Sequence, residues 1–197
     1  MIAKAVALCL MLAPGLVRAA DFADPDWPCI QRKAAQLSPG LMWPEPVPPQ
    51  SVPQDASDLA DLLALRRVDL DTAKLRIEAF AQAHPSADMA LMGNIFLLTF
   101  DKLSRDRDRL VAGIGRYSRG QIALADKITA ARDEMALLLD ADAPDFDRID
   151  ALEEQIDWDE RIYHDRARSL GYVCETPVLL EKRLYAVAQM LQAEASR

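Results

Sequence analysis

A helical pattern of apolar positions runs from Met89 to Leu139 and dominates the chain. At about 1.5 Å per residue, a helix of roughly fifty residues is about 75 Å long. Such a rod cannot bury its apolar face against itself, so the pattern predicts a partner helix. Apolar or small residues recur in steps of three and four, or sums of them, at Met92, Phe96, Thr99, Leu103, Leu110, Ile114, Tyr117, Leu124, Ile128, Ala131, Met135 and Leu138.

A second periodic segment, 146–170, supplies that partner. The residues Asp142-Ala143-Pro144-Asp145 between the two segments are typical of a tight turn. A short connection between long helices makes them antiparallel neighbours. We therefore predict an all-α fold built on a long antiparallel helical hairpin, coiled-coil-like at its tip. Its second apolar stripe consists of Phe146, Ile149, Leu152, Ile156, Tyr163 and Ala167.

Shorter helices are predicted to pack at the base of this hairpin. One begins at Asp55 or Ser57, and a second runs from about Asp71 to His84. A last helix begins at Thr176-Pro177, where threonine suits the N-cap and proline the first helical position.

The residues just before this last helix are expected to interrupt the second half of the hairpin. Gly171 suits a helix C-cap, so a break is predicted between Leu170 and Thr176, with Cys174 inside it.

The centre of the long helix contains a charged run, Lys102–Arg109, and three glycines, Gly113, Gly115 and Gly120. Each glycine inside a helix costs on the order of 1 kcal/mol relative to alanine. Two interpretations stay open: a hinge or close helix crossing, or small residues that let a neighbouring backbone approach.

The first residues are typical of a secretory signal peptide. A basic start, an apolar run from Ala5 to Leu16 and small residues before Ala20 predict cleavage after Ala19. The run is too short to span a membrane, so we expect no stable membrane insertion after cleavage. A lipid anchor at Cys9 is less favoured, because Leu8 stands where a small residue is expected. The predicted organisation is a signal peptide at 1–19, an N-terminal arm at 20–54 and a helical domain at 55–197.

Cysteine usage predicts one disulfide. Cys9 leaves with the signal peptide, so Cys29 and Cys174 remain, and a secreted chain usually pairs such cysteines. Closing a loop of about 145 residues contributes up to about 5 kcal/mol by chain-entropy arguments. Two buried free thiols or half of a metal site are the alternatives.

Prolines make the end of the N-terminal arm an extended connector. We expect the arm to be strapped across the helical body by the disulfide, with Trp27 and Trp43 as apolar anchors. A short helix is predicted at Cys29–Leu37, between Pro28 and the Pro39-Gly40 stop. The connector prolines are Pro44, Pro46, Pro48, Pro49 and Pro53.

Glu160 and His164 are the strongest candidates for chemistry. They are four residues apart on a predicted helix and share a face, where a carboxylate and an imidazole suit a transition metal or an acid and base pair. A third ligand would have to come from the facing helix, for example from Asp101, Asp106 or Asp108. The alternative, an exposed face of ion pairs with Arg161 and Arg168, is the more common use of such residues.

Composition and motifs exclude several function classes. Removing residues 1–19 leaves 21 basic and 31 acidic residues, a net charge of −10 against −8 for the whole chain. Acidic chains with scattered basic residues are not typical of nucleic-acid binding or of anionic membrane surfaces. No nucleophile, phosphate-loop, zinc-protease or EF-hand motif occurs, so no cofactor is predicted.

The segment Asp26–Arg32, Asp-Trp-Pro-Cys-Ile-Gln-Arg, resembles the N-terminal signature of an uncharacterised family of small secreted proteobacterial proteins that carry Asp-Trp-Pro-Cys-x-Gln-Arg. The resemblance extends at most to Leu41-Met42-Trp43 and implies a bacterial periplasmic setting.

These observations together predict a non-enzymatic periplasmic accessory or interaction protein. It would present an elongated acidic helical surface to an envelope protein partner, or self-associate through the hairpin. The alternative is a metal- or small-ligand-binding helical bundle that uses Glu160 and His164.

Overall fold

The structure is a computed structural model, and it describes residues 24, 26–34 and 36–196. The predicted signal peptide, 1–19, and Cys9 within it lie outside the described residues.

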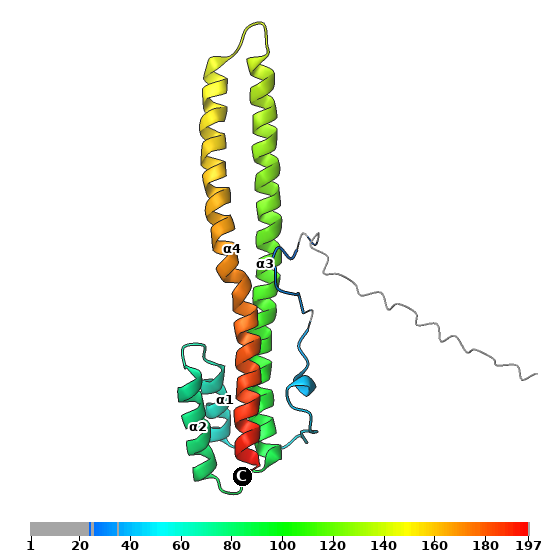
Figure 1. Cartoon of the computed structure of the whole chain (residues 1–197), viewed down its shortest axis with the longest axis vertical. Helices are drawn as coiled ribbons and strands as arrows, with labels where there is room; N and C mark the ends of the chain where they lie inside the picture. Colours follow the sequence, from blue (N-terminus) through cyan, green and yellow to red (C-terminus); the bar gives the residue numbers. More distant parts are fainter. Residues whose placement is uncertain (1–23, 25, 35, 197) are drawn as a thin grey trace, which may run out of the picture.

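An antiparallel pair of long helices forms the body of the molecule (Figure 1). Helix α3, Met89–Leu139, has 51 residues, and helix α4, Phe146–Ala195, has 50. Two short helices, α1 (Gln54–Ala64) and α2 (Leu70–Ala83), pack at the base, α1 against α3 and α2 against α4. The only other helical element in the described part is a 3-10 turn, η1, at Pro39–Leu41. The predicted all-α helical hairpin is therefore confirmed.

Aspartate side chains define where three of the helices begin. Asp69 and Asp145 accept hydrogen bonds from backbone N–H groups in the first turns of α2 and α4. Asp88 accepts one from the N–H of Leu91 at 2.8 Å, so it caps α3. A carboxylate at a helix N-terminus satisfies a free donor and faces the positive end of the helix dipole.

Burial divides the hairpin into three levels. The base holds the largest core, where all four helices meet around residues such as Phe96, Leu103 and Leu184. A second cluster joins Ile114 to the disulfide at mid-height. Farther out, only α3 and α4 remain, and their core shrinks to Ile128, Ala131, Leu152 and Ile156. The distal hairpin is therefore two helices held together by a thin apolar seam.

Arg183 fixes the end of α1 to α4. Its side chain is buried, and it donates hydrogen bonds to the carbonyls of Leu63 at 2.8 Å and Val68 at 2.6 Å. Burial lowers the pKa of the guanidinium, which the nearby Asp69 carboxylate partly offsets. The bond to Leu63 satisfies a carbonyl that the end of α1 leaves without a helical partner, and the bond to Val68 satisfies a carbonyl in the α1–α2 connection.

Helix α4 is continuous through the predicted break, so the expectation of a separate last helix from Thr176-Pro177 is wrong. Pro177 lies inside the helix and is buried, and Cys174 is helical. The Thr176 hydroxyl donates to the Tyr172 carbonyl, one turn back, instead of capping a new helix. Packing against α3 on both sides of Gly171 outweighs the local preference to stop. Figure 1 shows α4 bending about halfway along, as expected near a proline.

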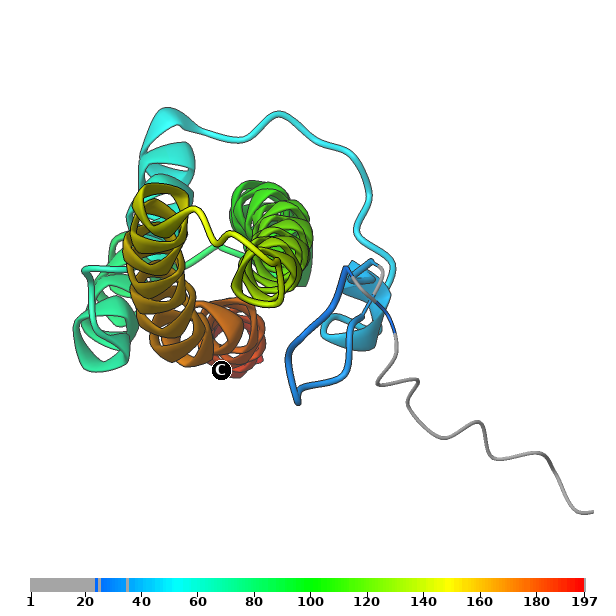
Figure 2. The same cartoon turned by 90° about the horizontal axis from the view of Figure 1, so that it is seen from above.

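The N-terminal arm and the α1–α2 pair lie on opposite sides of the hairpin, as Figures 1 and 2 show. Trp43 is buried and stacks on Phe96 of α3, with ring centroids 5.5 Å apart. The Asn94 side-chain amide donates to the Pro48 carbonyl at 3.1 Å, and the Gln192 amide donates to the Met42 carbonyl at 2.8 Å. The extended, strapped arm is thus confirmed.

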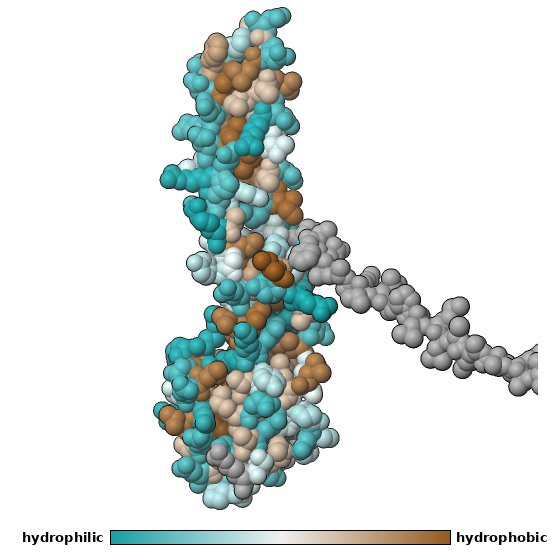
Figure 3. All heavy atoms as spheres, viewed as in Figure 1, coloured by the Kyte–Doolittle hydropathy of each residue, from teal (hydrophilic) through white to brown (hydrophobic). Residues whose placement is uncertain are grey.

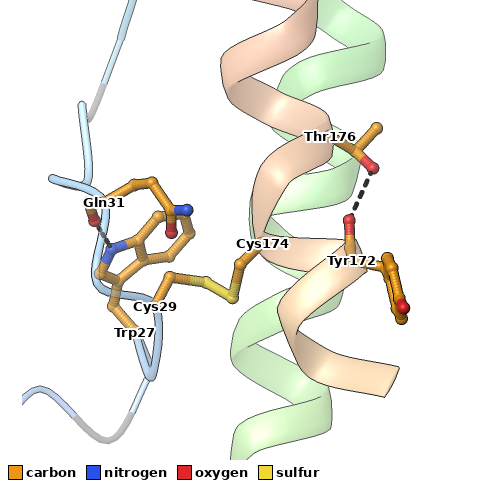
Figure 4. Close-up of a disulfide and its surroundings, with 6 residues drawn as sticks. All are labelled: Trp27, Cys29, Gln31, Tyr172, Cys174 and Thr176. Atoms are coloured by element: carbon orange, nitrogen blue, oxygen red, sulfur yellow. Dashed lines mark hydrogen bonds between the residues drawn. A yellow bond between two sulfur atoms is a disulfide. The ribbon is translucent and has the colours of Figure 1, made fainter. Parts of the chain in front are cut away.

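Cys29 and Cys174 form the predicted disulfide, which ties the arm to α4 (Figure 4). Both cysteines are buried, and Trp27 packs beside them while its indole N–H donates to the Gln31 carbonyl. The predicted short helix at Cys29–Leu37 is wrong, because the described residues there are irregular. In this segment the Gln31 carbonyl accepts from the Trp27 indole, and the Ala34 carbonyl accepts from the Arg107 side chain of α3.

Candidate functional site

Glu160 and His164 lie one turn apart on α4 and line the same open groove against α3, as their spacing predicts. Within it, the Glu160 carboxylate forms an ion pair with Arg132 of α3. The His164 ring meets the ring of Tyr163 edge-on, with centroids 5.8 Å apart. The other groove residues are Ala125, Ile128 and Thr129.

No third ligand joins this pair in the described part of the chain. The described residues contain no group of three or more His, Cys, Asp or Glu side chains that could hold a metal ion. Asp101, Asp106 and Asp108 pair with arginines on their own helix. Asp108 also lies about 20 residues from the groove along α3, a distance on the order of 30 Å. The groove therefore offers an ion pair and a histidine, and the metal-binding alternative gains no support from its geometry.

The charged run 102–109 contains a buried arginine that the sequence analysis did not single out. Arg107 is 1% exposed and lies where α3, α4 and the arm meet. Its guanidinium donates to the Glu181 carboxylate at 2.6 Å and to the Ala34 carbonyl at 2.5 Å, and it contacts Asp108 at 3.2 Å. Arg107 follows Leu103 by four residues and precedes Ile114 by seven, so it continues the apolar stripe. This spacing was the sequence signal that could have predicted a buried Arg107.

The glycines at the centre of α3 do not break the helix. A methyl group on Gly115 would come within 3.3 Å of the Asp26 carbonyl, so this glycine lets the arm's backbone approach. Gly120 has no such neighbour within 4 Å, and Gly113 meets only the end of a flexible arginine. The close-approach interpretation therefore holds at Gly115 alone among the three.

Charge is concentrated at the distal end of the hairpin. Residues 133–157 contain ten acidic side chains and one basic side chain, Arg148, a formal charge of −9 that exceeds the −8 of the whole chain. All ten carboxylates are on exposed residues. Within the described chain only Glu134 among them forms an ion pair, with Arg148 at 2.6 Å. Other ion pairs join the helices just below, including Lys127 to Asp159 at 2.8 Å.

Large apolar side chains stand exposed among these carboxylates. Leu137 is 76% exposed, Leu139 54% and Phe146 65%, and all three lie within one turn of the hairpin's end. Trp158 is 63% exposed about three turns lower on α4. On the face drawn in Figure 3, apolar atoms lie among hydrophilic ones along the distal hairpin.

Acidity was predicted as a property of the whole chain, and its concentration at the tip was not predicted. Residues 102–132 carry eight basic and three acidic side chains, so the long helix changes sign of charge along its length. A charge count over a window of about three heptads would have found both segments.

Comparisons with known proteins add no relationship. No protein-family model matches the chain, and neither a curated protein nor a solved structure matches it. Among the residues that the structure describes, no helix is long and apolar enough to cross a membrane.

Proposed function

We propose that the protein is a non-enzymatic periplasmic accessory protein that uses its hairpin to bind an envelope protein. One observation carries the proposal: the distal hairpin extends beyond α1, α2 and the arm, and has an exposed acidic surface with unpaired carboxylates. A surface of one sign of charge steers and orients an oppositely charged partner.

The periplasmic setting is part of this proposal. Its support is the signal-like start of the sequence, the resemblance at Asp26–Arg32 and the Cys29–Cys174 disulfide, which is typical of oxidising compartments. The disulfide fixes the arm to α4 at mid-height, below the distal hairpin, so it supports a rigid platform from which the distal hairpin projects.

An enzymatic role is less favoured by the side-chain arrangement. The two histidines of the chain are far apart in sequence, and both are engaged. His84 contacts the Phe80 carbonyl through Nδ1 and the Asp55 carboxylate through Nε2, the latter at 2.8 Å. His164 lies against Tyr163 in an open groove. In the described residues neither histidine is hydrogen-bonded to a serine, threonine or cysteine side chain that it could activate as a nucleophile.

Site-specific cross-linking in the native host tests the proposal. A photo-reactive residue in place of Ala143, in the exposed tip loop, should form an adduct with an envelope protein. The same residue in place of Ala79, exposed on α2, is the matched control and should form far less adduct. No adduct from positions along the hairpin, together with turnover of a small molecule by the purified chain, would contradict the proposal.

A further inference from the structure

We infer that the end of the hairpin is a docking surface for a cationic polypeptide segment that has an apolar face. The inference rests on the proposed function and names the chemistry of its partner. We call this surface the tip surface and define it by the exposed side chains of Leu137, Leu139 and Phe146 with the carboxylates of residues 133–157.

The apolar side chains of the tip surface are ones that the hairpin's own core does not bury. Leu138 packs on the distal seam with Met135 and Leu152. Its neighbours Leu137 and Leu139 point elsewhere and stay exposed, as does Phe146 at the start of α4. Single exposed apolar residues are ordinary, but several at one end of a projecting element are typical of contact surfaces.

The charges around these residues decide what covers them. A formal charge of −9 in 25 residues repels nucleic acid, anionic lipid and the tip of a second copy alike. A cationic segment is attracted, and its apolar face would cover the leucines and the phenylalanine. Charge complementarity therefore selects one class of occupant for the apolar patch.

The spacing of the carboxylates favours an extended polycation over a single ion. No cluster in the described residues gathers three potential metal ligands. The tip-surface carboxylates on α4 instead run from Asp147 to Asp157, a length of about 15 Å. Lysines or arginines along a helical segment of similar length match this arrangement, because each needs only one nearby carboxylate.

The test measures binding of a synthetic amphipathic peptide of about 18 residues, or five helical turns. Its composition is leucine and lysine with the leucines on one face, and a scrambled peptide of the same composition has no apolar face. Fluorescence anisotropy with the disulfide-bonded chain, residues 20–197, should give binding that weakens steeply with salt. The scrambled peptide should bind on the order of tenfold more weakly.

Two sets of variants separate the tip surface from general acidity. Neutralising four tip carboxylates should weaken peptide binding on the order of tenfold at low salt. Neutralising four exposed carboxylates elsewhere, none in an ion pair in the described chain, should change it less than about twofold. The tip variant combines Asp142→Asn, Asp150→Asn, Glu153→Gln and Glu154→Gln, and the control combines Glu45→Gln, Asp71→Asn, Asp126→Asn and Glu175→Gln.

A third variant, Leu137→Ser with Phe146→Ser, should remove the preference for the amphipathic peptide over the scrambled one. Tyr172→Ser with Leu179→Ser is its control, because these residues are similarly exposed on α4 but lie far from the hairpin's end. Figure 4 shows Tyr172 directed away from the disulfide, so this control leaves the disulfide's surroundings intact.

Three results would overturn the inference: equal binding by the tip and control charge variants, equal binding of both peptides by the unmodified chain, or concentration-dependent dimers in light scattering that the tip variants abolish. The outcome is separable from the proposed function. Cross-links from another part of the hairpin, with no peptide binding at the tip, would retain the function and reject the tip surface. Peptide binding at the tip without any envelope adduct would retain the tip surface and reject the proposed function.

Discussion

Replacing glycine by alanine at different positions of α3 should change stability in opposite directions. At Gly120 a new methyl group meets nothing within 4 Å, so the substitution only reduces the entropy of the unfolded chain and improves helix propensity. The expected gain in the free energy of unfolding is about 0.5–1 kcal/mol. Gly113 should behave similarly, because only the mobile end of Arg116 lies near it, at 3.8 Å.

At Gly93 the same substitution should destabilise. The added methyl carbon would lie 2.7 Å from Cγ2 of Val47 and 3.2 Å from the indole nitrogen of Trp43. Both side chains belong to the arm, and Trp43 is buried in the base core. Forcing such contacts apart costs about 1–3 kcal/mol, which outweighs the gain in helix propensity. The two substitutions should therefore differ by about 1–3 kcal/mol.

Thermal unfolding followed by circular dichroism measures this difference. For a chain of this size, 1 kcal/mol shifts the midpoint by about 2–4 °C. Ala123→Gly, an exposed position on the same helix, calibrates the propensity effect and should lower the midpoint. A lower midpoint for Gly120→Ala would refute the reasoning, because it would mean that the helix uses this glycine as a hinge.

Three further changes have defined outcomes. Arg107→Met should destabilise by about 2–4 kcal/mol in urea unfolding, because it leaves Glu181 without its buried partner; adding Glu181→Gln should recover part of this loss, and no recovery would contradict the pairing. Cys174→Ser should lower stability by at most about 5 kcal/mol and expose the arm to proteolysis while helicity is retained; an arm that stays protected would show that the disulfide is not what holds it. The N–H and hydroxyl of Thr72 lower the pKa of Asp69, so the contribution of this carboxylate to the free energy of unfolding should be complete above about pH 4 and disappear as pH falls through the lowered pKa. If the difference in unfolding midpoint between the wild type and Asp69→Asn stays unchanged down to pH 2, the prediction is refuted.

Periodicity predicted the hairpin because the signal is repeated many times along it. Leu152 and Ile156, for example, are buried against α3 where the pattern placed them. Signals carried by single residues predicted the helix boundaries less well. Pro177 and Gly171 carry strong local signals for a helix end, but burial against α3 and attachment through Cys174 are tertiary effects that no local pattern contains.

At the candidate site, too, local spacing was predicted correctly and tertiary contacts were not. The spacing of Glu160 and His164 correctly placed them together, since both lie on one helix. What faces them depends on the register between α3 and α4, which sets Arg132 opposite Glu160 and leaves the three aspartates elsewhere. Arg107 was hidden by its residue type, because a charged side chain is rarely assigned to an apolar stripe.

The disulfide also constrains the order in which the chain can fold. Cys29 and Cys174 are separated by 145 residues, so Cys29 is synthesised long before its partner in α4. During that interval Cys29 has no other cysteine of the mature chain to react with, because Cys9 belongs to the predicted signal peptide. Once the proposed signal peptide has been removed, incorrect pairing within one molecule is impossible, and the only competing reaction is with another molecule. Rapid formation of the α3–α4 hairpin, whose turn is local, brings Cys174 to mid-height and ends that exposure.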